Sequence, residues 1–181
     1  MFRNSLVFDP ETYGRWKRDS VRQVDIVTGC FFLIARQLWH SLNGFDPAFF
    51  MYGEEADLCL RARQLGYRPM ITPDATIIHY GGASERARAD KLVKLLRSKV
   101  QLFDRNWSVP AAKFGAAMML LWAGSRAAAW ALLARKGNEK HQQSRQAWTE
   151  VWRRRAEWLG GDRAQSPGGS VSVAQLVESS T

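Results

Sequence analysis

Three apolar runs within the first 80 residues have the composition of β-strands. Residues 24–35 (VDIVTGCFFLIA), 67–72 (YRPMIT) and 75–80 (ATIIHY) are rich in β-branched and aromatic side chains. Continuous runs of this kind are typical of strands that are buried in a sheet. They predict a few-stranded mixed sheet, in which Gly29 interrupts the first strand.

Two short helices are predicted between these runs. Residues 36–44 carry leucines at helical spacing and end at Asn43-Gly44, a typical C-terminal stop. Residues 54–65 carry one apolar stripe, begin with acids and end at Gly66. Strands and helices that alternate in this way indicate the α/β class.

Three longer helical patterns follow. They cover residues 86–105, which are basic, residues 111–135, which are strongly apolar, and residues 139–159, which are rich in Trp and Arg. Two flanking segments have no such period. Residues 1–23 are polar and are predicted to form a loop or lid, and residues 160–181 begin with the Gly, Ser and Pro typical of a disordered tail.

The charge of the chain is concentrated in its second half. Residues 1–85 contain 9 Lys and Arg against 10 Asp and Glu, whereas residues 86–181 contain 17 against 7. This asymmetry favours an anionic partner for the second half, such as a membrane surface, although a solvated basic face would also explain it. Nucleic acid is not expected as a partner, because the basic helices carry bulky Trp and no groove-reading motif.

The cysteines and the N-terminus indicate a cytoplasmic protein. Cys30 and Cys59 are too few for a disulfide framework, and each lies in an apolar pattern. Both are therefore expected to be buried free thiols in a reducing compartment. The first 16 residues contain no apolar run of signal-peptide length.

Three carboxylates open the second helix, directly after an aromatic loop. The helix macrodipole stabilises acids such as Glu54, Glu55 and Asp57 at this position, and Asp57 can pair with Arg61 one turn later. A carboxylate beside the aromatic loop is also partly desolvated, which favours a general base. Neighbouring side chains on a helix point about 100° apart, so Glu54 and Glu55 cannot both reach one atom. Helix capping and catalysis both remain open on this evidence.

The motifs around this helix resemble a known enzyme family. VTGCFFLIAR, NGFDPAFFMYGEEADLCLRARQLGY and PDATIIHYGGAS are similar, in order and spacing, to the C-terminal half of family 2 glycosyltransferases. Bacterial rhamnosyltransferase-type enzymes of polysaccharide assembly are the most similar group. The resemblance implies that residues 24–109 form the C-terminal half of a GT-A fold. It also implies inverting transfer of a sugar from a nucleotide-sugar to a saccharide acceptor in bacterial cell-surface polysaccharide assembly.

The resemblance assigns roles to the residues around the acid pair. The second acid of the pair is the base that deprotonates the acceptor hydroxyl, and this role falls to Glu55, where Asp is usual. Glu54 would support the loop, and Asp57 with Arg61 would lock the helix. The residues implied to contact substrate are Gly44, Phe45, Asp46 and Tyr52.

The resemblance also implies a divalent metal, Mn²⁺ or Mg²⁺. On its own, His79 would be interpreted as a half-buried strand histidine that is bonded to a backbone carbonyl. In similar GT-A enzymes a His at this place binds the metal that holds the donor diphosphate, and imidazole is a suitable ligand for Mn²⁺. The glycines at 81–82 could bring backbone N–H groups to the same anion.

The sequence lacks the motif that marks the nucleotide-binding half of such an enzyme. That half ends in an Asp-x-Asp motif, and no Asp-x-Asp occurs in this sequence. The chain is therefore expected to need an N-terminal glycosyltransferase half as partner, as a fragment or as part of a split enzyme. The alternative is a non-catalytic remnant that binds a membrane or a partner protein.

The periodicity of residues 110–159 predicts helices that would fit either a membrane surface or packing against the domain or a partner chain. Residues 114–125 are uncharged, but these 12 residues are fewer than the roughly 20 needed to span a bilayer. Trp combined with Arg is typical of interfacial helices, so peripheral binding to the cytoplasmic face of the inner membrane is expected. One side of the apolar helix is predicted to carry Phe114, Met118, Leu121, Ser125, Ala129 and Leu132, and a second stripe Trp122, Arg126 and Trp130.

Overall fold

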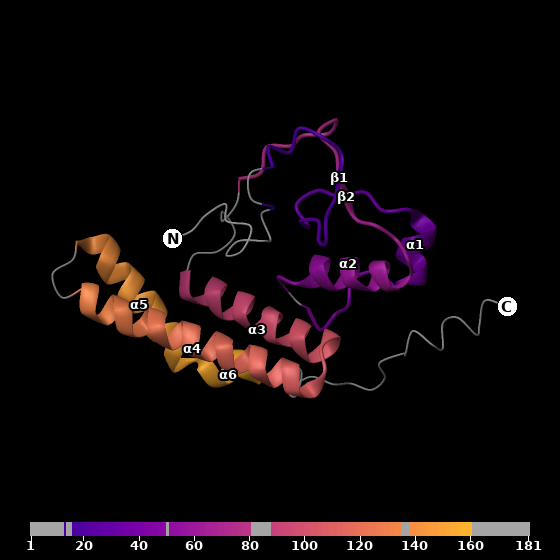
Figure 1. Ribbon diagram of the computed structural model, residues 1–181. Coiled ribbons are helices and arrows are strands. Elements are labelled where there is room, and N and C mark those ends of the chain that lie inside the picture. The colour runs from indigo at the N-terminus through magenta and orange to yellow at the C-terminus, as the bar shows by residue number, and fades with distance from the viewer. Residues whose placement is uncertain (1–12, 14–15, 50, 81–87, 135–137, 161–181) are drawn as a thin grey trace. The chain divides into compact units, whose positions relative to one another are not determined.

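The computed structural model describes Tyr13 and residues 16–49, 51–80, 88–134 and 138–160, and these form two compact units (Figure 1). The described residues within Met1–Gly44 and Leu58–His79 form unit 1, and those within Phe45–Asp57 and Tyr80–Thr181 form unit 2. The predicted tail, most of the predicted lid and the Gly81-Gly82 loop lie outside the described residues.

Unit 1 contains a small antiparallel sheet of two strands. Strand β1 (Arg22–Gln23) pairs with β2 (Met70–Ile71), with Arg22 opposite Ile71 and Gln23 opposite Met70. The backbone N–H of Val24 extends the pairing by donating to the Pro69 carbonyl at 3.0 Å. The fold is thus mixed α/β and mostly helical, and the sheet is antiparallel where a mixed one was predicted.

Most of the predicted strand residues are not in strands. Residues 24–35 contain no strand, 75–80 contain none, and only Met70–Ile71 of 67–72 belong to one. These runs leave large apolar side chains exposed, among them Leu33 at 89% and Ile78 at 81%. A strand forms only when a neighbouring strand satisfies its backbone groups, and composition cannot supply that neighbour. The strand prediction was wrong for this reason.

The two predicted short helices are confirmed. Helix α1 (Arg36–Ser41) ends before Asn43 and Gly44, which have φ values of 55° and 66°. Helix α2 (Glu54–Gln64) ends before Gly66, whose φ of 86° is the left-handed conformation of a helix stop. The core of unit 1 is formed by Leu38, Leu42, Leu58 and Ala62.

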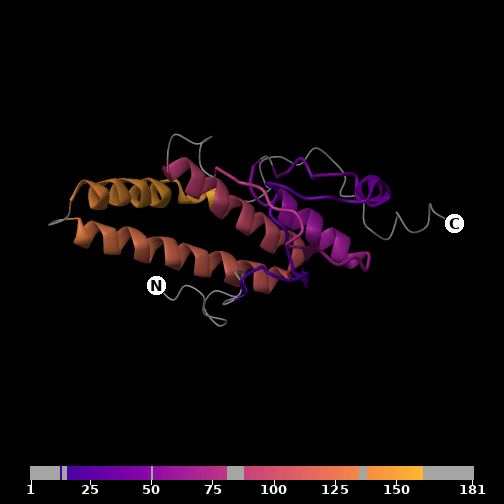
Figure 2. The same cartoon turned by 90° about the horizontal axis from the view of Figure 1, so that it is seen from above.

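Unit 2 contains a bundle of helices in which the predicted long helices appear. Helix α3 (Arg88–Asn106) packs against α4 (Val109–Leu133), and α4 packs in turn against α5 (Glu139–Arg153) (Figures 1 and 2). The short helix α6 (Arg155–Leu159) packs against α3. The bundle core is made of Val93, Leu96, Val100, Ala123, Trp148, Val151 and Trp158.

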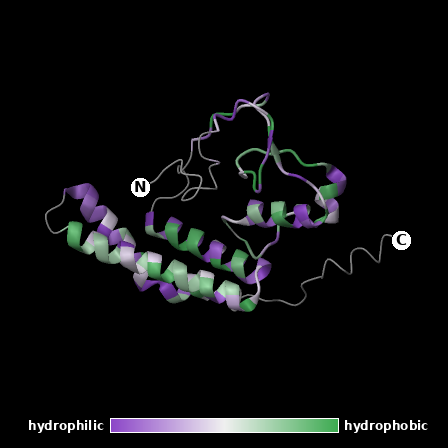
Figure 3. Cartoon of the chain, viewed as in Figure 1, coloured by the Kyte–Doolittle hydropathy of each residue, from purple (hydrophilic) through white to green (hydrophobic). Residues whose placement is uncertain are grey.

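Helix α4 is longer than its uncharged centre. It has 25 residues and continues through Lys113 and Arg126, so by length and composition it could cross a membrane. The helix predicted over 111–135 is confirmed, but the 12-residue count underestimated the length available to span a bilayer, because the apolar helix continues past the single charges of Lys113 and Arg126. Figure 3 shows α4 pale to green along its length, whereas α5 carries much of the purple of hydrophilic residues.

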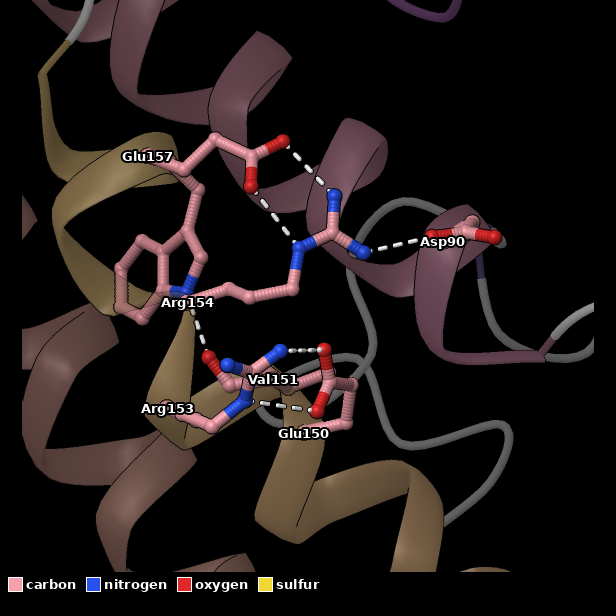
Figure 4. Close-up of polar contacts among 7 residues, drawn as sticks. Asp90, Glu150, Val151, Arg153, Arg154 and Glu157 are labelled. Carbon is pink, nitrogen blue, oxygen red and sulfur yellow. Dashed lines mark hydrogen bonds and ion pairs between the residues drawn. The ribbon is translucent and has the colours of Figure 1, made fainter.

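The predicted helix over 139–159 is broken at Arg154 into α5 and α6 (Figure 4). Arg154 donates to both carboxylate oxygens of Glu157, at 2.8 and 2.7 Å, and also pairs with Asp90 of α3. Hydrogen bonds from Arg154 hold the pKa of the Glu157 carboxyl below its usual range. The guanidinium therefore fixes the corner between the two helices to α3.

The structure distinguishes buried from exposed side chains among the Trp residues and the two cysteines. Trp148 and Trp158 lie in the bundle core, so packing explains them, whereas Trp122 and Trp152 remain partly exposed at 40% and 36%. Cys59 is buried as predicted, but Cys30 is exposed because the strand that was expected to bury it does not form.

Candidate active site

The loop before α2 turns the chain sharply into the acidic first turn. Tyr52 and Gly53 have φ values of 71° and 90°, two left-handed residues in a row. The left-handed region is unfavourable for an aromatic residue, so the surroundings must hold Tyr52 there. At Gly53 a Cβ would lie 3.0 Å from the Cβ of Ser98 and 3.1 Å from the Phe49 ring, so only glycine fits.

Helix α3 holds this loop through buried polar side chains. The Ser98 hydroxyl donates to the Tyr52 carbonyl at 2.6 Å, directly at the left-handed turn. The side-chain amide of Gln101, one helical turn later, donates to the Ala48 carbonyl at 3.5 Å. Ser98 and Gln101 are 5% and 3% exposed, so these bonds form away from water, where an unsatisfied partner would be costly.

Arg105 lies on the same side of α3 and contacts two of the predicted site acids. Its guanidinium pairs with Asp46 and lies 3.9 Å from Asp57, and it also lies over the Phe49 ring at 5.0 Å. Asp46 accepts a second bond, from the Ala48 N–H at 2.9 Å, which closes the turn around Pro47. Asp57 is 4% exposed, so its contact with Arg105 links the start of α2 to α3 away from solvent.

The acid pair occupies the first turn of α2 beside this anchored loop. Glu54 and Glu55 are both partly buried, and the Oε2 atoms of both are inaccessible to solvent. In the described part of the chain, Oε2 of Glu54 has no hydrogen-bond partner. The acid pair therefore presents carboxylate oxygens to the protein side of the loop, where a bound hydroxyl group would be within reach of a general base.

Within unit 2, the structure therefore brings together five predicted site residues. These are Asp46, Tyr52, Glu54, Glu55 and Asp57, all on the loop or the first turn of α2. Phe45, predicted to contact substrate, opens the same loop and is 38% exposed. Lys91 of α3 lies over the Tyr52 ring at 5.8 Å and adds a positive charge beside the aromatic loop.

Two further predicted residues meet in unit 1. The Arg61 guanidinium donates to the Gly44 carbonyl at 2.9 Å and to the Leu42 carbonyl at 2.6 Å. Arg61 thereby satisfies two carbonyls just beyond the C-terminus of α1, where a positive charge is favourable. The pairing of Arg61 with Asp57 stays a prediction. Gly44 lies against Trp39, whose ring would be 2.8 Å from an added Cβ.

His79 is the predicted metal ligand, and it lies at the end of unit 1. Its side chain is exposed, and no strand ends at it, contrary to the prediction. Among the described residues, no group of three or more His, Cys, Asp or Glu could hold a metal ion. A single imidazole does not make a metal site, so the described residues do not fit a complete Mn²⁺ or Mg²⁺ centre.

The anchoring residues of α3 were not predicted from sequence. Ser98, Gln101 and Arg105 recur at intervals of three and four residues, which places them on one side of the helix. Buried polar residues on a helix that is otherwise apolar on its inner side indicate a polar partner. This polar stripe was the signal in the sequence that could have identified them.

Comparison with known proteins finds local similarity to enzymes of polysaccharide synthesis. The chain is 39% identical over 64 residues to rhamnosyltransferase WbbL of Escherichia coli, which is 35% of this chain and 24% of that protein. It is 36% identical over 80 residues to the O-antigen biosynthesis protein RfbC of Myxococcus xanthus, and this match covers 44% of this chain and 6% of that protein. It is 33% identical over 61 residues to N-acetylglucosaminyl-diphospho-decaprenol L-rhamnosyltransferase of Mycobacterium tuberculosis, and this match covers 34% of this chain and 20% of that protein.

These matches suggest a glycosyltransferase family with a role in polysaccharide biosynthesis. The matched segments span about a quarter or less of each of these three proteins. No family model matches the chain. No solved structure matches it either.

Proposed function

We propose that this chain contributes the acceptor side and the catalytic base of an inverting, rhamnosyltransferase-like glycosyltransferase of the GT-A type. The observation that carries the proposal is the acid pair Glu54-Glu55, withdrawn from water beside a loop that α3 holds in a left-handed turn. The local similarity to rhamnosyltransferases supports the reaction class. The substrates are a nucleotide-sugar and a saccharide acceptor.

In the proposed step, Glu55 is the general base. Its carboxylate takes the proton of an acceptor hydroxyl, while the hydroxyl oxygen bonds to the anomeric carbon of the donor. The bond from that carbon to the diphosphate oxygen breaks, and the nucleoside diphosphate leaves with the electron pair. Glu54 points about 100° away on the helix, so it supports the loop instead of sharing the proton. Asp46, Tyr52 and Phe45 would line the acceptor.

The donor site is proposed to come from residues outside this sequence, in the same polypeptide or in another. The described residues offer no acidic cluster for a metal-bound diphosphate. The apolar runs 24–35 and 75–79 expose Phe31, Leu33 and Ile78, and strands supplied from outside would give these runs the neighbours they lack. If a divalent metal is used, it would neutralise the leaving group, with His79 as one ligand of several.

The proposal is tested with a chimera in which this chain replaces the matching segment of E. coli WbbL. The purified chimera is assayed for transfer from nucleotide-sugar donors to saccharide acceptors, beside the chain alone. We expect transfer by the chimera, because it combines the base with a complete donor side. Failure of a folded chimera on every donor that WbbL uses would favour a non-catalytic role for the chain.

A separate prediction concerns His79. In the active chimera, His79→Ala should raise the Mn²⁺ concentration needed for half-maximal transfer, because one ligand to the metal is lost. Metal-requirement curves measure this, and His40→Ala, a histidine on α1, is the matched control. The same curve for His79→Ala and the parent chimera would exclude His79 as a metal ligand.

A further inference from the structure

One side of α4 is apolar and exposed along the length of the helix. Phe114, Met118, Leu121 and Leu132 are 68%, 49%, 66% and 63% exposed. Ser125 and Ala129 lie between them and are also exposed. At 3.6 residues per turn these six side chains share one side, which we call the α4 face. The face consists of Phe114, Met118, Leu121, Ser125, Ala129 and Leu132.

The opposite side of α4 is apolar as well. Ala112, Gly115 and Ala123 are buried there, where α4 packs against the rest of the bundle. Gly115 allows the rings of Phe103 and Trp107 to approach, and Gly124 does the same for Trp152. A helix that is apolar on all sides is normally covered on all sides. The α4 face is the side that the described residues leave uncovered.

The charges next to the α4 face are positive. Lys113 and Arg126 are the only ionisable residues in the 25 residues of α4, and each is next in sequence to a residue of the face. Arg126 lies over the Trp122 ring at 5.6 Å, and Arg155 lies over the Trp152 ring at 5.3 Å. Trp and Arg beside an apolar strip is the arrangement of a helix at a lipid headgroup boundary.

A bilayer fits these observations better than a second copy of the chain. Residues 86–181 carry 17 Lys and Arg against 7 Asp and Glu, so two copies meeting at α4 would repel each other. The same charge attracts anionic lipid. A spanning orientation is unfavourable because α4 packs along α5, whose ionised residues would enter the hydrocarbon. An orientation in the plane of the interface avoids this.

We propose that the α4 face docks in the plane of an anionic bilayer. The side chains of Phe114, Leu121 and Leu132 enter the boundary between headgroups and acyl chains. Lys113 and Arg126 pair with lipid phosphates at its edges. This docking is inferred from the helical bundle of unit 2 and does not depend on the proposed sugar transfer, so either proposal can fail while the other holds.

The experiment is vesicle flotation of the full chain at low salt. One set of vesicles is phosphatidylcholine, and the other is an equimolar mixture with phosphatidylglycerol. We expect flotation with the mixed vesicles and much less with phosphatidylcholine. Phe114→Glu combined with Leu121→Glu should lower the partition coefficient roughly tenfold or more, because two buried apolar side chains are lost. Lys113→Gln combined with Arg126→Gln should lower it roughly tenfold on mixed vesicles.

The matched control adds the same charge elsewhere in the bundle. Gln146→Glu with Thr149→Glu changes two exposed positions of α5 and should leave flotation close to the parent value. Met118→Gln with Leu121→Gln removes apolar area without adding charge and should also abolish most binding. Circular dichroism verifies that each variant is folded.

Two results would overturn the proposal. In the first, the parent chain does not float with mixed vesicles, or the face variants float as well as the control variant. In the second, light scattering shows a dimer that Phe114→Glu with Leu121→Glu converts to a monomer, without any flotation. The second result would assign the α4 face to a second copy of the chain.

Discussion

Glu55→Gln in the active chimera should lower kcat by roughly 10²- to 10⁴-fold, the usual contribution of a positioned general base. Glutamine keeps the shape of the side chain but cannot accept the proton of the acceptor hydroxyl. The residue lies in the first turn of α2, where its Oε2 is shielded from solvent. The fold should be retained, since helix formation does not require this charge.

Glu54→Gln is the matched control, because it makes the same change one residue earlier. It should lower kcat clearly less than Glu55→Gln does, since Glu54 points in another direction on the helix. Steady-state rates at saturating donor and acceptor measure both variants. Unchanged turnover in Glu55→Gln would remove this residue from the mechanism, and the reverse order of effects would mean that the two acids exchange roles.

Trp158→Ala should produce the largest loss of stability in the helical bundle, roughly 3–5 kcal/mol of unfolding free energy. The Trp158 side chain is fully buried in the core, and its indole N–H donates to the Val151 carbonyl at 3.0 Å. The substitution creates a large cavity and removes that hydrogen bond. Urea unfolding followed by far-ultraviolet circular dichroism measures the change.

Trp152 provides the comparison, because it has the same side chain on α5 but is partly exposed. Trp152→Ala should cost markedly less than Trp158→Ala. Trp158→Phe should lie between them, since it keeps most of the ring but leaves the Val151 carbonyl without its indole donor. Equal destabilisation by Trp152→Ala and Trp158→Ala would contradict the described core.

The helices could be predicted from sequence because their determinants are local. The apolar spacing in 54–65, the acids that open this segment and Gly66 at its end identified α2 nearly to the residue. The strands could not be predicted, because a strand depends on a partner elsewhere in the chain. Residues 24–35 have strand composition. Among the described residues, however, the pairing with β2 is made by Arg22–Gln23, just before this run. The predicted burial of Cys30 was wrong because it depended on a strand over residues 24–35, which does not form.

The candidate site was predictable only in part for the same reason. Glu54, Glu55 and Asp57 stand together in the sequence, so the acid cluster was visible. Ser98 reaches Tyr52 across 46 positions, and Arg105 reaches Asp46 across 59. Such pairings depend on how α3 returns to the loop, which local patterns do not encode. A polar stripe such as that on α3 is typical of residues with a buried partner, but it does not identify that partner.

In the proposed enzyme, the chain carries the base of a sugar transferase and residues outside it supply the donor site. The most direct measurement is sugar transfer by the purified 181-residue chain, compared with the chimera at equal concentration. We expect no transfer above the buffer rate by the chain alone, because one candidate ligand cannot hold a metal-bound diphosphate, and clear transfer by the chimera. Robust transfer by the chain alone, or none by a folded chimera, would contradict this proposal.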